Sequence, residues 1–344
     1  ALNGGPGVRR LRSVSAAGIS VIWVEFDWGE EIYRARQVVA ERVQGVTLPD
    51  QVDAPALGPI SSIMGEITFI ALTSETVGPL PLRRLAETVV RRGLLAIPGI
   101  SQVVPIGGDV REYQVEVDPA VLTLHGVALE EVAGTLRRAS RNPAAGFHVD
   151  AGQEYLVRGL GRARGAEDLA AAVVRVRDGI PLEVGDLARV GVGAEPKRGT
   201  AAYRTRPAVV LSVQKQPGAN TLELTREIDR MLEELAATLP EGVVIEKENF
   251  RQADFIEVAV RNVATAMAEG GVLVVLILIL FLGHLRTTFI SAIAIPLSVV
   301  SGLLVIALAG GSLNTMTLGG LTIAVGALVD DAIIGVENVF RRLR

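Results

Sequence analysis

The 344-residue sequence contains no cysteine, only three histidines and only 4% aromatic residues. The absence of cysteine excludes a disulfide scaffold, a thiolate zinc site and a cysteine nucleophile. With 34 Lys and Arg against 38 Asp and Glu, the net charge of −4 provides no basic footprint, so a nucleic-acid partner is not expected. Charge is also missing locally, because no charged residue lies in 270–283 or in 287–329.

These uncharged stretches predict three membrane helices. A helix needs about 20 mostly apolar residues to span a bilayer, and residues 263–283 supply one such segment. The longer stretch is interrupted by Gly310–Asn314, which predicts one helix over 288–309 and another over 315–337. Buried helices of soluble proteins are rarely apolar all round for so long, so membrane lipid is an expected partner.

The two ends of the sequence predict a fragment of a larger membrane protein. The chain starts at Ala1 without an initiator Met or a signal peptide, and it stops shortly after the third apolar segment. Basic residues flank the helices at Arg286 and within 338–344. The positive-inside rule therefore predicts that 338–344 is a cytoplasmic end and that residues 1–262 lie outside the cytoplasm.

The polar part of the chain repeats a strand–helix–strand pattern four times. Two such units build a ferredoxin-like split β–α–β sandwich, so four units predict two α+β domains. The stretch Ala151–Arg206, rich in Gly and short strands, predicts a small inserted domain. The expected strands are Ile19–Phe26, Thr68–Thr73, Ser101–Ile106, Glu112–Val117, Gly146–Val149, Ala208–Val213 and Val243–Lys247, and the expected helices are Glu30–Val43, 82–95, 128–139 and 220–238.

The polar region offers no catalytic centre. The Gly clusters Ile106–Gly108 and Arg158–Gly161 lack the Lys-Ser/Thr that follows in a phosphate-binding P-loop. His125 and His148 have no second His or carboxylate one helical turn away, which is typical of surface residues rather than metal ligands. Because no nucleophile–base pair is visible, an enzyme is not expected, and the sequence leaves any metal-binding residues unknown.

The third apolar segment carries the one group of residues that points to chemistry. Asp330 and Asp331 are adjacent within it, and Glu337 follows Asp330 by seven residues, nearly on the same helix face. A charge at mid-membrane costs at least about 2.5–3.5 kcal/mol, so these acids are protonated or pair with a cation from elsewhere. Asp330 and Asp331 are therefore predicted to form a proton relay, and Glu337 fits either a relay or a helix end. The small residues Gly326 and Ala327 allow a neighbouring helix to approach closely.

Several motifs together resemble one transporter superfamily. Paired α+β domains followed by Val329–Ile333 and Glu337–Asn338 resemble the resistance–nodulation–division (RND) exporters. The resemblance runs along the whole chain in order. Segments that resemble the heavy-metal efflux branch, which includes copper/silver and cobalt–zinc–cadmium exporters, are Gly107–Gly108, Glu112–Val115, Glu154–Arg158, Met316–Gly320 and Phe340–Leu343.

This resemblance implies a periplasmic porter region followed by a transmembrane α-helical bundle in the bacterial inner membrane. It implies a secondary active transporter, a proton antiporter that exports heavy-metal cations without a cofactor other than the proton-motive force. The implied partners are two further copies in a homotrimer, a periplasmic adaptor and an outer-membrane channel. The implied boundaries are 1–109 for the first porter subdomain, 110–150 with 206–250 for the second, 151–205 for a docking subdomain and 251–262 for a connector.

The sequence also departs from the heavy-metal pattern. Some metal exporters carry a small residue at the position of Asp331, and others carry an extra acid where this chain has Ala324. The double Asp is also usual in the drug-exporting branch, which leaves a drug or amphiphile exporter as an alternative. A protein-translocation accessory of the same superfamily would be expected to lack the insertion, and a scaffold or sensor domain anchored by three helices would not need buried acids.

Overall fold

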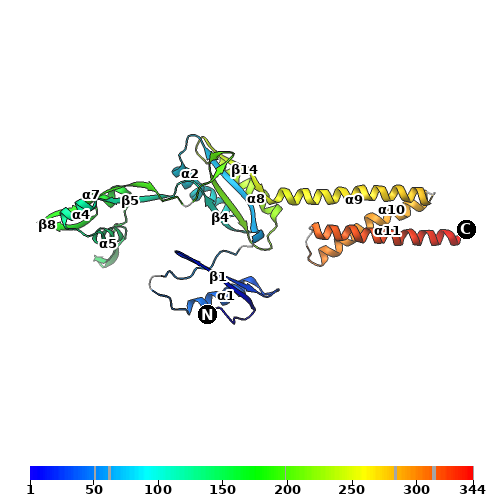
Figure 1. The fold of residues 1–344 in the computed structure, drawn as a ribbon, viewed down its shortest axis with the longest axis horizontal. Coiled ribbons are helices and arrows are strands. Elements are labelled where there is room, and N and C mark those ends of the chain that lie inside the picture. Colours follow the sequence, from blue (N-terminus) through cyan, green and yellow to red (C-terminus); the bar gives the residue numbers. More distant parts are fainter. Residues whose placement is uncertain (50–51, 61–62, 198, 283–284, 312–314, 344) are drawn as a thin grey trace. The chain divides into compact units, whose positions relative to one another are not determined.

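A computed structural model describes residues 1–49, 52–60, 63–197, 199–282, 285–311 and 315–343. The chain divides into two compact units, Ala1–Ser61 and Ser62–Arg344, which Figure 1 shows in sequence colours. Part of the predicted break between the second and third helices, residues 312–314, lies outside the described residues, as does the last residue of the predicted cytoplasmic end.

The first unit consists of a β-hairpin and one helix. Strand β1 (Val8–Ala16) pairs antiparallel with β2 (Ile19–Phe26), and α1 spans Ile32–Gln44. The Glu31 carboxylate caps α1 by accepting hydrogen bonds from two backbone N–H groups of its first turn, which otherwise have no partner within the helix. The predicted strand Ile19–Phe26 and the predicted helix Glu30–Val43 are confirmed, whereas strand β1 was not predicted.

The centre of the second unit is a four-stranded antiparallel sheet with strand order β14–β3–β13–β4. Two helical segments pack against one face of it, which is the arrangement of a split β–α–β sandwich. The strands are β3 (Glu66–Ser74), β4 (Ile100–Ile106), β13 (Val209–Lys215) and β14 (Val243–Arg251). The helical segments are α8 (Thr221–Ala236) and a run made of α2 (Pro79–Leu85), η2 (Ala86–Val90) and α3 (Arg91–Leu95).

The main core lies between this sheet and its helices. Val209, Leu211 and Val213 alternate along β13 and are fully buried against the helices, as the two-residue period of a strand requires. Leu94 and Ile228 close the core from the two helical segments. On the other face of the sheet a second cluster contains Ala71, Tyr203 and Ala208.

The strand pairing differs from the grouping that the sequence suggested. We expected 110–150 to pair with 206–250 and 1–109 to form a separate subdomain. Instead, β13 and β14 join β3 and β4 in one sheet, so that 66–106 and 209–251 form a single sandwich. The local pattern identifies each strand–helix unit, but the partner of a strand depends on which of its faces are buried. Because β13 is buried on both faces, it takes a central place between two strands.

Residues 107–208, between β4 and β13, form an insertion longer than the expected 151–205. Its β5 pairs antiparallel with β10, and Val132, Val184 and Leu187 form its core. Its elements are β5 (Arg111–Val117), α4 (Pro119–His125), α5 (Leu129–Ala139), β6 (Ala144–Asp150), β7 (Gln153–Arg158), α6 (Ala166–Ala170), β8 (Val173–Arg177), β9 (Ile180–Glu183), α7 (Val184–Leu187), β10 (Ala188–Ala194), β11 (Ala202–Tyr203) and β12 (Arg206–Pro207).

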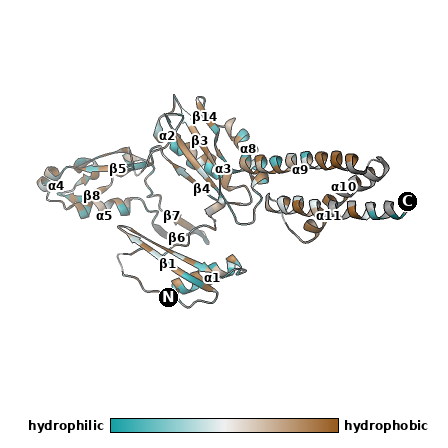
Figure 2. Ribbon diagram, turned by 45° about the vertical axis from the view of Figure 1, so that its right-hand side comes forward, coloured by the Kyte–Doolittle hydropathy of each residue, from teal (hydrophilic) through white to brown (hydrophobic). Residues whose placement is uncertain are grey.

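Three long helices complete the second unit: α9 (Gln252–Leu282), α10 (Leu285–Leu308) and α11 (Thr315–Leu343). They contact one another, and each corresponds to one of the predicted apolar helices. The predicted connector 251–262 is not a separate segment, because β14 ends at Arg251 and α9 begins at the next residue. Figure 2 shows the change from mixed hydropathy at the start of α9 to hydrophobic residues along its second half.

Among the described residues, one helix is long enough and apolar enough to cross a membrane. It is α9, over Gln252–Ile277, and its most apolar part is not buried by the rest of the protein. A shorter apolar segment, Pro296–Leu308, lies in α10.

Candidate functional site

The three predicted acids all lie on α11. Asp330 and Asp331 follow the start of this helix by about four turns, and Glu337 lies about two turns further on. The helix extends through Leu343, so Glu337 is not at its end. The backbone of these residues is described, whereas their side chains lie outside the described part of the structure.

The helical period divides these acids between two rows of α11. Residues seven apart on an α-helix lie within about 20° of each other around its axis. Asp331 continues a row that passes through Thr317 and Ala324, both of which line a cavity against α10. Asp330 and Glu337 continue the row of Ile323, whose side chain is 78% exposed. In the described part of these rows, Thr317 and Ala324 line the cavity and Ile323 does not.

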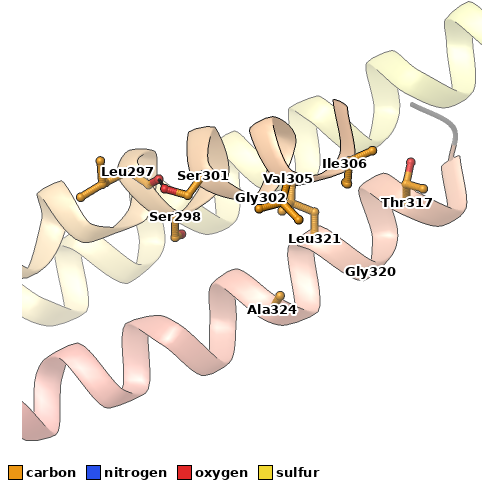
Figure 3. A pocket seen from close by; sticks show the side chains of 10 residues that line it. All are labelled: Leu297, Ser298, Ser301, Gly302, Val305, Ile306, Thr317, Gly320, Leu321 and Ala324. Carbon is orange, nitrogen blue, oxygen red and sulfur yellow. Dashed lines mark hydrogen bonds between the residues drawn. The ribbon is translucent and has the colours of Figure 1, made fainter. Parts of the chain in front are cut away.

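The cavity between α10 and α11 is open and mostly apolar, with a volume of about 660 Å³. Figure 3 shows its side chains converging from the two helices. The Ser301 hydroxyl, which lines it, donates to the Leu297 carbonyl oxygen at 2.7 Å, so that this group is satisfied within its own helix. The lining residues are Leu297, Ser298, Ser301, Gly302, Val305, Ile306, Thr317, Gly320, Leu321 and Ala324.

A glycine of α10 lies against α11 beside this cavity. A Cβ atom added at Gly302 would lie 2.6 Å from the Leu321 Cδ1 atom, and Leu321 is only 8% exposed. Gly302 therefore allows a close approach of α10 to α11, as small residues do where two helices pack. No described atom lies within 4 Å of a Cβ added at Gly326, which we expected to serve this purpose. That expectation therefore stays a prediction.

Within the ranges that the structure describes, no group of three or more His, Cys, Asp or Glu side chains could hold a metal ion. His125 ends α4, and His148 is exposed on β6, so the structure does not bring them together on one element. The sequence analysis did not identify a cluster of charged side chains where β14 meets α9. The one signal in the sequence was that Lys247 and Arg251, which pair with acids of α8, lie four residues apart on this strand.

Comparison with known proteins identifies the class. The family model described as the AcrB/AcrD/AcrF family matches residues 1–344, and the chain therefore belongs to that family. The cobalt-zinc-cadmium resistance protein CzcA of Cupriavidus metallidurans is 32% identical over 98% of this chain. The cation efflux system protein CusA of Escherichia coli K12 is 34% identical, also over 98% of this chain.

A solved structure agrees with these relatives. The crystal structure of a heavy metal efflux pump superimposes with a TM-score of 0.87 and 28% sequence identity over 99% of this chain. The resemblance to RND heavy-metal efflux permeases drawn from the sequence is thus confirmed. The chain covers 32% of the CzcA sequence, 33% of CusA and 34% of the crystallised pump, so it spans about a third of the length of these relatives.

Proposed function

We propose that this chain is part of a proton-driven exporter of heavy-metal cations. The observation that carries the proposal is the pair Asp330–Asp331 inside a long, largely apolar helix of a chain whose relatives are named for metal resistance and cation efflux. Acids at such positions are costly in a membrane and mark ion or proton pathways. In this proposal the metal ion is the substrate, and no resident metal is required.

The two rows of α11 suggest how protonation acts. Protonation of Asp330 removes a negative charge from the row of Ile323. The attraction of Asp330 to a cation on a further helix then weakens. Protonation of Asp331 removes a charge from the row that continues toward α10. One proton crossing 100 mV supplies about 2.3 kcal/mol, and one or two protons can therefore bias a conformational equilibrium of a few kcal/mol.

The proposal places the protein in the bacterial inner membrane with α9, α10 and α11 as membrane spans. Residues 1–251 would then form the periplasmic porter and docking regions, because the basic residues that flank the helices favour a cytoplasmic location for Arg286 and Arg342. The working assembly would be a homotrimer joined to a periplasmic adaptor and an outer-membrane channel. These are properties of the whole transporter, of which this chain would supply about a third.

A drug or amphiphile exporter is the second candidate. It is favoured by the adjacent acids and by the lack of a metal-holding cluster among the described residues. A protein-translocation accessory is less well supported, because the large insertion between β4 and β13 has its own core.

The test is Asp330→Asn in the complete transporter. Asn keeps the shape of a protonated Asp but cannot release a proton, so accumulation of Zn²⁺, Co²⁺ or Cu⁺ in inverted vesicles should lose its dependence on the proton gradient. At 100 mV this corresponds to about a fifty-fold loss in the accumulation ratio. Asp178→Asn, in an exposed turn with a φ of 51° that Asn tolerates, is the matched control and should transport like wild type.

Related variants refine the assignment. Asp331→Asn should be comparably damaging if the two acids titrate as a coupled pair, and Glu337→Gln should have the smallest effect. Undiminished proton-driven uptake by Asp330→Asn would remove the relay assignment. Uptake of amphiphilic dyes but not of metal ions by wild type would favour the second candidate.

A further inference from the structure

The sandwich and the first membrane helix share one continuous backbone path. Strand β14 ends at Arg251, and α9 begins at Gln252 with no loop between them. Strand β14 is also an edge strand, since β3 is its only neighbour in the sheet. A displacement of α9 therefore acts directly on a strand that the sheet holds from one side only, and other contacts must prevent that strand from peeling away.

A cluster of charges provides such contacts. The Arg251 guanidinium donates two hydrogen bonds to the Asp229 carboxylate of α8, at 2.9 and 2.8 Å. The Lys247 ammonium lies 3.9 Å from Asp229 Oδ1 and 3.1 Å from Glu233 Oε1, also on α8. Arg251 Nε lies 3.4 Å from Asp254 Oδ1, in the first turn of α9. Arg251 thus bonds to α8 and to α9 at once.

The environment makes this pair stronger than an ordinary surface ion pair. The side chains of Arg251 and Asp229 are 22% and 29% exposed. The hydrogen bond to Asp229 is the main cause that raises the pKa of Arg251. A two-pronged Arg–carboxylate contact also fixes orientation, which a single bond between flexible chains does not.

Apolar contacts support the same junction. Ala253, in the first turn of α9, is 3% exposed. The rings of Phe69 and Phe250 lie 5.4 Å apart, and those of Phe250 and Phe255 lie 6.1 Å apart. These rings connect β3, β14 and α9 in a row, so the start of α9 is attached to the sheet as well as to α8.

We propose that the Asp229–Arg251 pair is a coupling joint that fastens α8 to the junction of β14 and α9, so that movement of α9 moves the sandwich as one piece. This inference rests on the proposed transport function. Asp229 and Arg251 act as positioning residues that carry motion between two parts of the protein.

The test compares Asp229→Asn and Arg251→Gln in the complete transporter with Arg230→Gln. Arg230 is the matched control, because it pairs with Glu227 of the same helix at 3.0 Å and both side chains are largely exposed. The expected result is about a tenfold loss of maximal metal transport per folded molecule, with the KM for the metal unchanged, for the first two variants only. The double variant should lose no more transport than Asp229→Asn or Arg251→Gln alone, because each of these variants breaks the same contact.

A second measurement does not depend on transport. This chain has no cysteine, so spin labels can be attached to cysteines introduced at Glu234 of α8 and Val258 of α9, both exposed. Wild type and Arg230→Gln should give one narrow distance distribution, and Asp229→Asn a broadened one. Arg251→Lys, which keeps the charge without the two-pronged contact, should fall between them.

The outcomes separate the two proposals. If wild type shows no proton-dependent transport, the proposed function fails, and the distance distributions still decide the joint. If wild type transports and Asp229→Asn matches it in rate and in distance distribution, the joint is refuted. Loss of transport that is fully accounted for by a smaller folded fraction would likewise refute it, and so would additive effects in the double variant.

Discussion

The sandwich and the three long helices use the same apolar residue types in opposite ways. In the sandwich, Ile67, Leu211 and Ile228 are at most 2% exposed. In the helices, Leu280 and Leu308 are each 80% exposed. The sandwich removes apolar surface from water by burying it within its own fold, whereas the helices satisfy their backbone hydrogen bonds internally and leave their side chains outward. The apolar content of a segment therefore does not show by itself whether its side chains form a buried core.

The same substitution in the two regions should separate these roles most strongly. Leu211→Ala should cost about 2–5 kcal/mol of local stability, because it leaves a cavity between the sheet and its helices. Leu280→Ala removes as many atoms from an exposed position and should cost less than about 0.5 kcal/mol. Hydrogen–deuterium exchange of β13 and α9 amides in detergent measures both effects. Equal costs would mean that α9 is packed in the working protein as tightly as β13.

Glycine replacements compare how the regions tolerate a close approach. Gly107 has a φ of 80°, and an added Cβ would lie 2.7 Å from the Ala208 carbonyl oxygen and 2.8 Å from the Ala201 nitrogen. Both neighbours are backbone atoms, so Gly107→Ala should cost about 2 kcal/mol or more.

The matched change in the long helices is Gly302→Ala. Outside its own helix, the described atom within 4 Å of its added Cβ is Leu321 Cδ1, the far end of a flexible side chain. We expect a cost below about 1 kcal/mol, since Ala also favours the helix by about that amount. Thermal unfolding followed by exchange of β4 and α10 amides compares the two variants. A larger loss for Gly302→Ala would show that the contact of α10 with α11 is the less adaptable one.

The smallest effect should come from the insertion, where charge rather than burial adds stability. The Arg175 guanidinium donates to both oxygens of Glu131 at 2.9 and 2.7 Å, and this bond is the first cause that lowers the pKa of Glu131 from its ordinary 4.5. A lowered folded-state pKa stabilises above pH 4.5 and loses its contribution as the pH falls through that lowered value.

Glu131→Gln should therefore speed amide exchange in α5 a few-fold at pH 7, and the difference from wild type should shrink below pH 4.5. Glu130→Gln, in the same helix turn, is the control and should exchange like wild type at pH 7. A difference that persists at pH 3 would assign the effect to the shape of the side chain rather than to its charge.

Local features of the fold could be predicted from the sequence, and long-range ones could not. The run Ile19–Phe26 is a strand with those bounds, and the apolar segments all form helices. The pairing of β13 with β3 could not be predicted, because the register partners Leu72 and Val209 are separated by 136 residues that include the whole insertion, and periodicity carries no information across such a distance.

The candidate site shows the same division. Asp330, Asp331 and Glu337 were recognisable because charge is conspicuous in an apolar helix. Gly302 of α10 and the Asp229–Arg251 pair were not, since a glycine in an apolar run and charges on an amphipathic helix are ordinary until a neighbour is placed beside them. A candidate role that depends on one helix can be proposed from the sequence, and one that depends on a contact between two helices cannot.

The insertion leaves the sandwich and returns to it at adjacent places. Ile106, the last residue of β4, is the register partner of Val210 near the start of β13, so the two strands would form an ordinary hairpin if a short turn replaced residues 107–208. The entropy of closing a loop grows only slowly with its length. The insertion can thus be exchanged or resized during evolution while the sheet and its link to α9 stay in register.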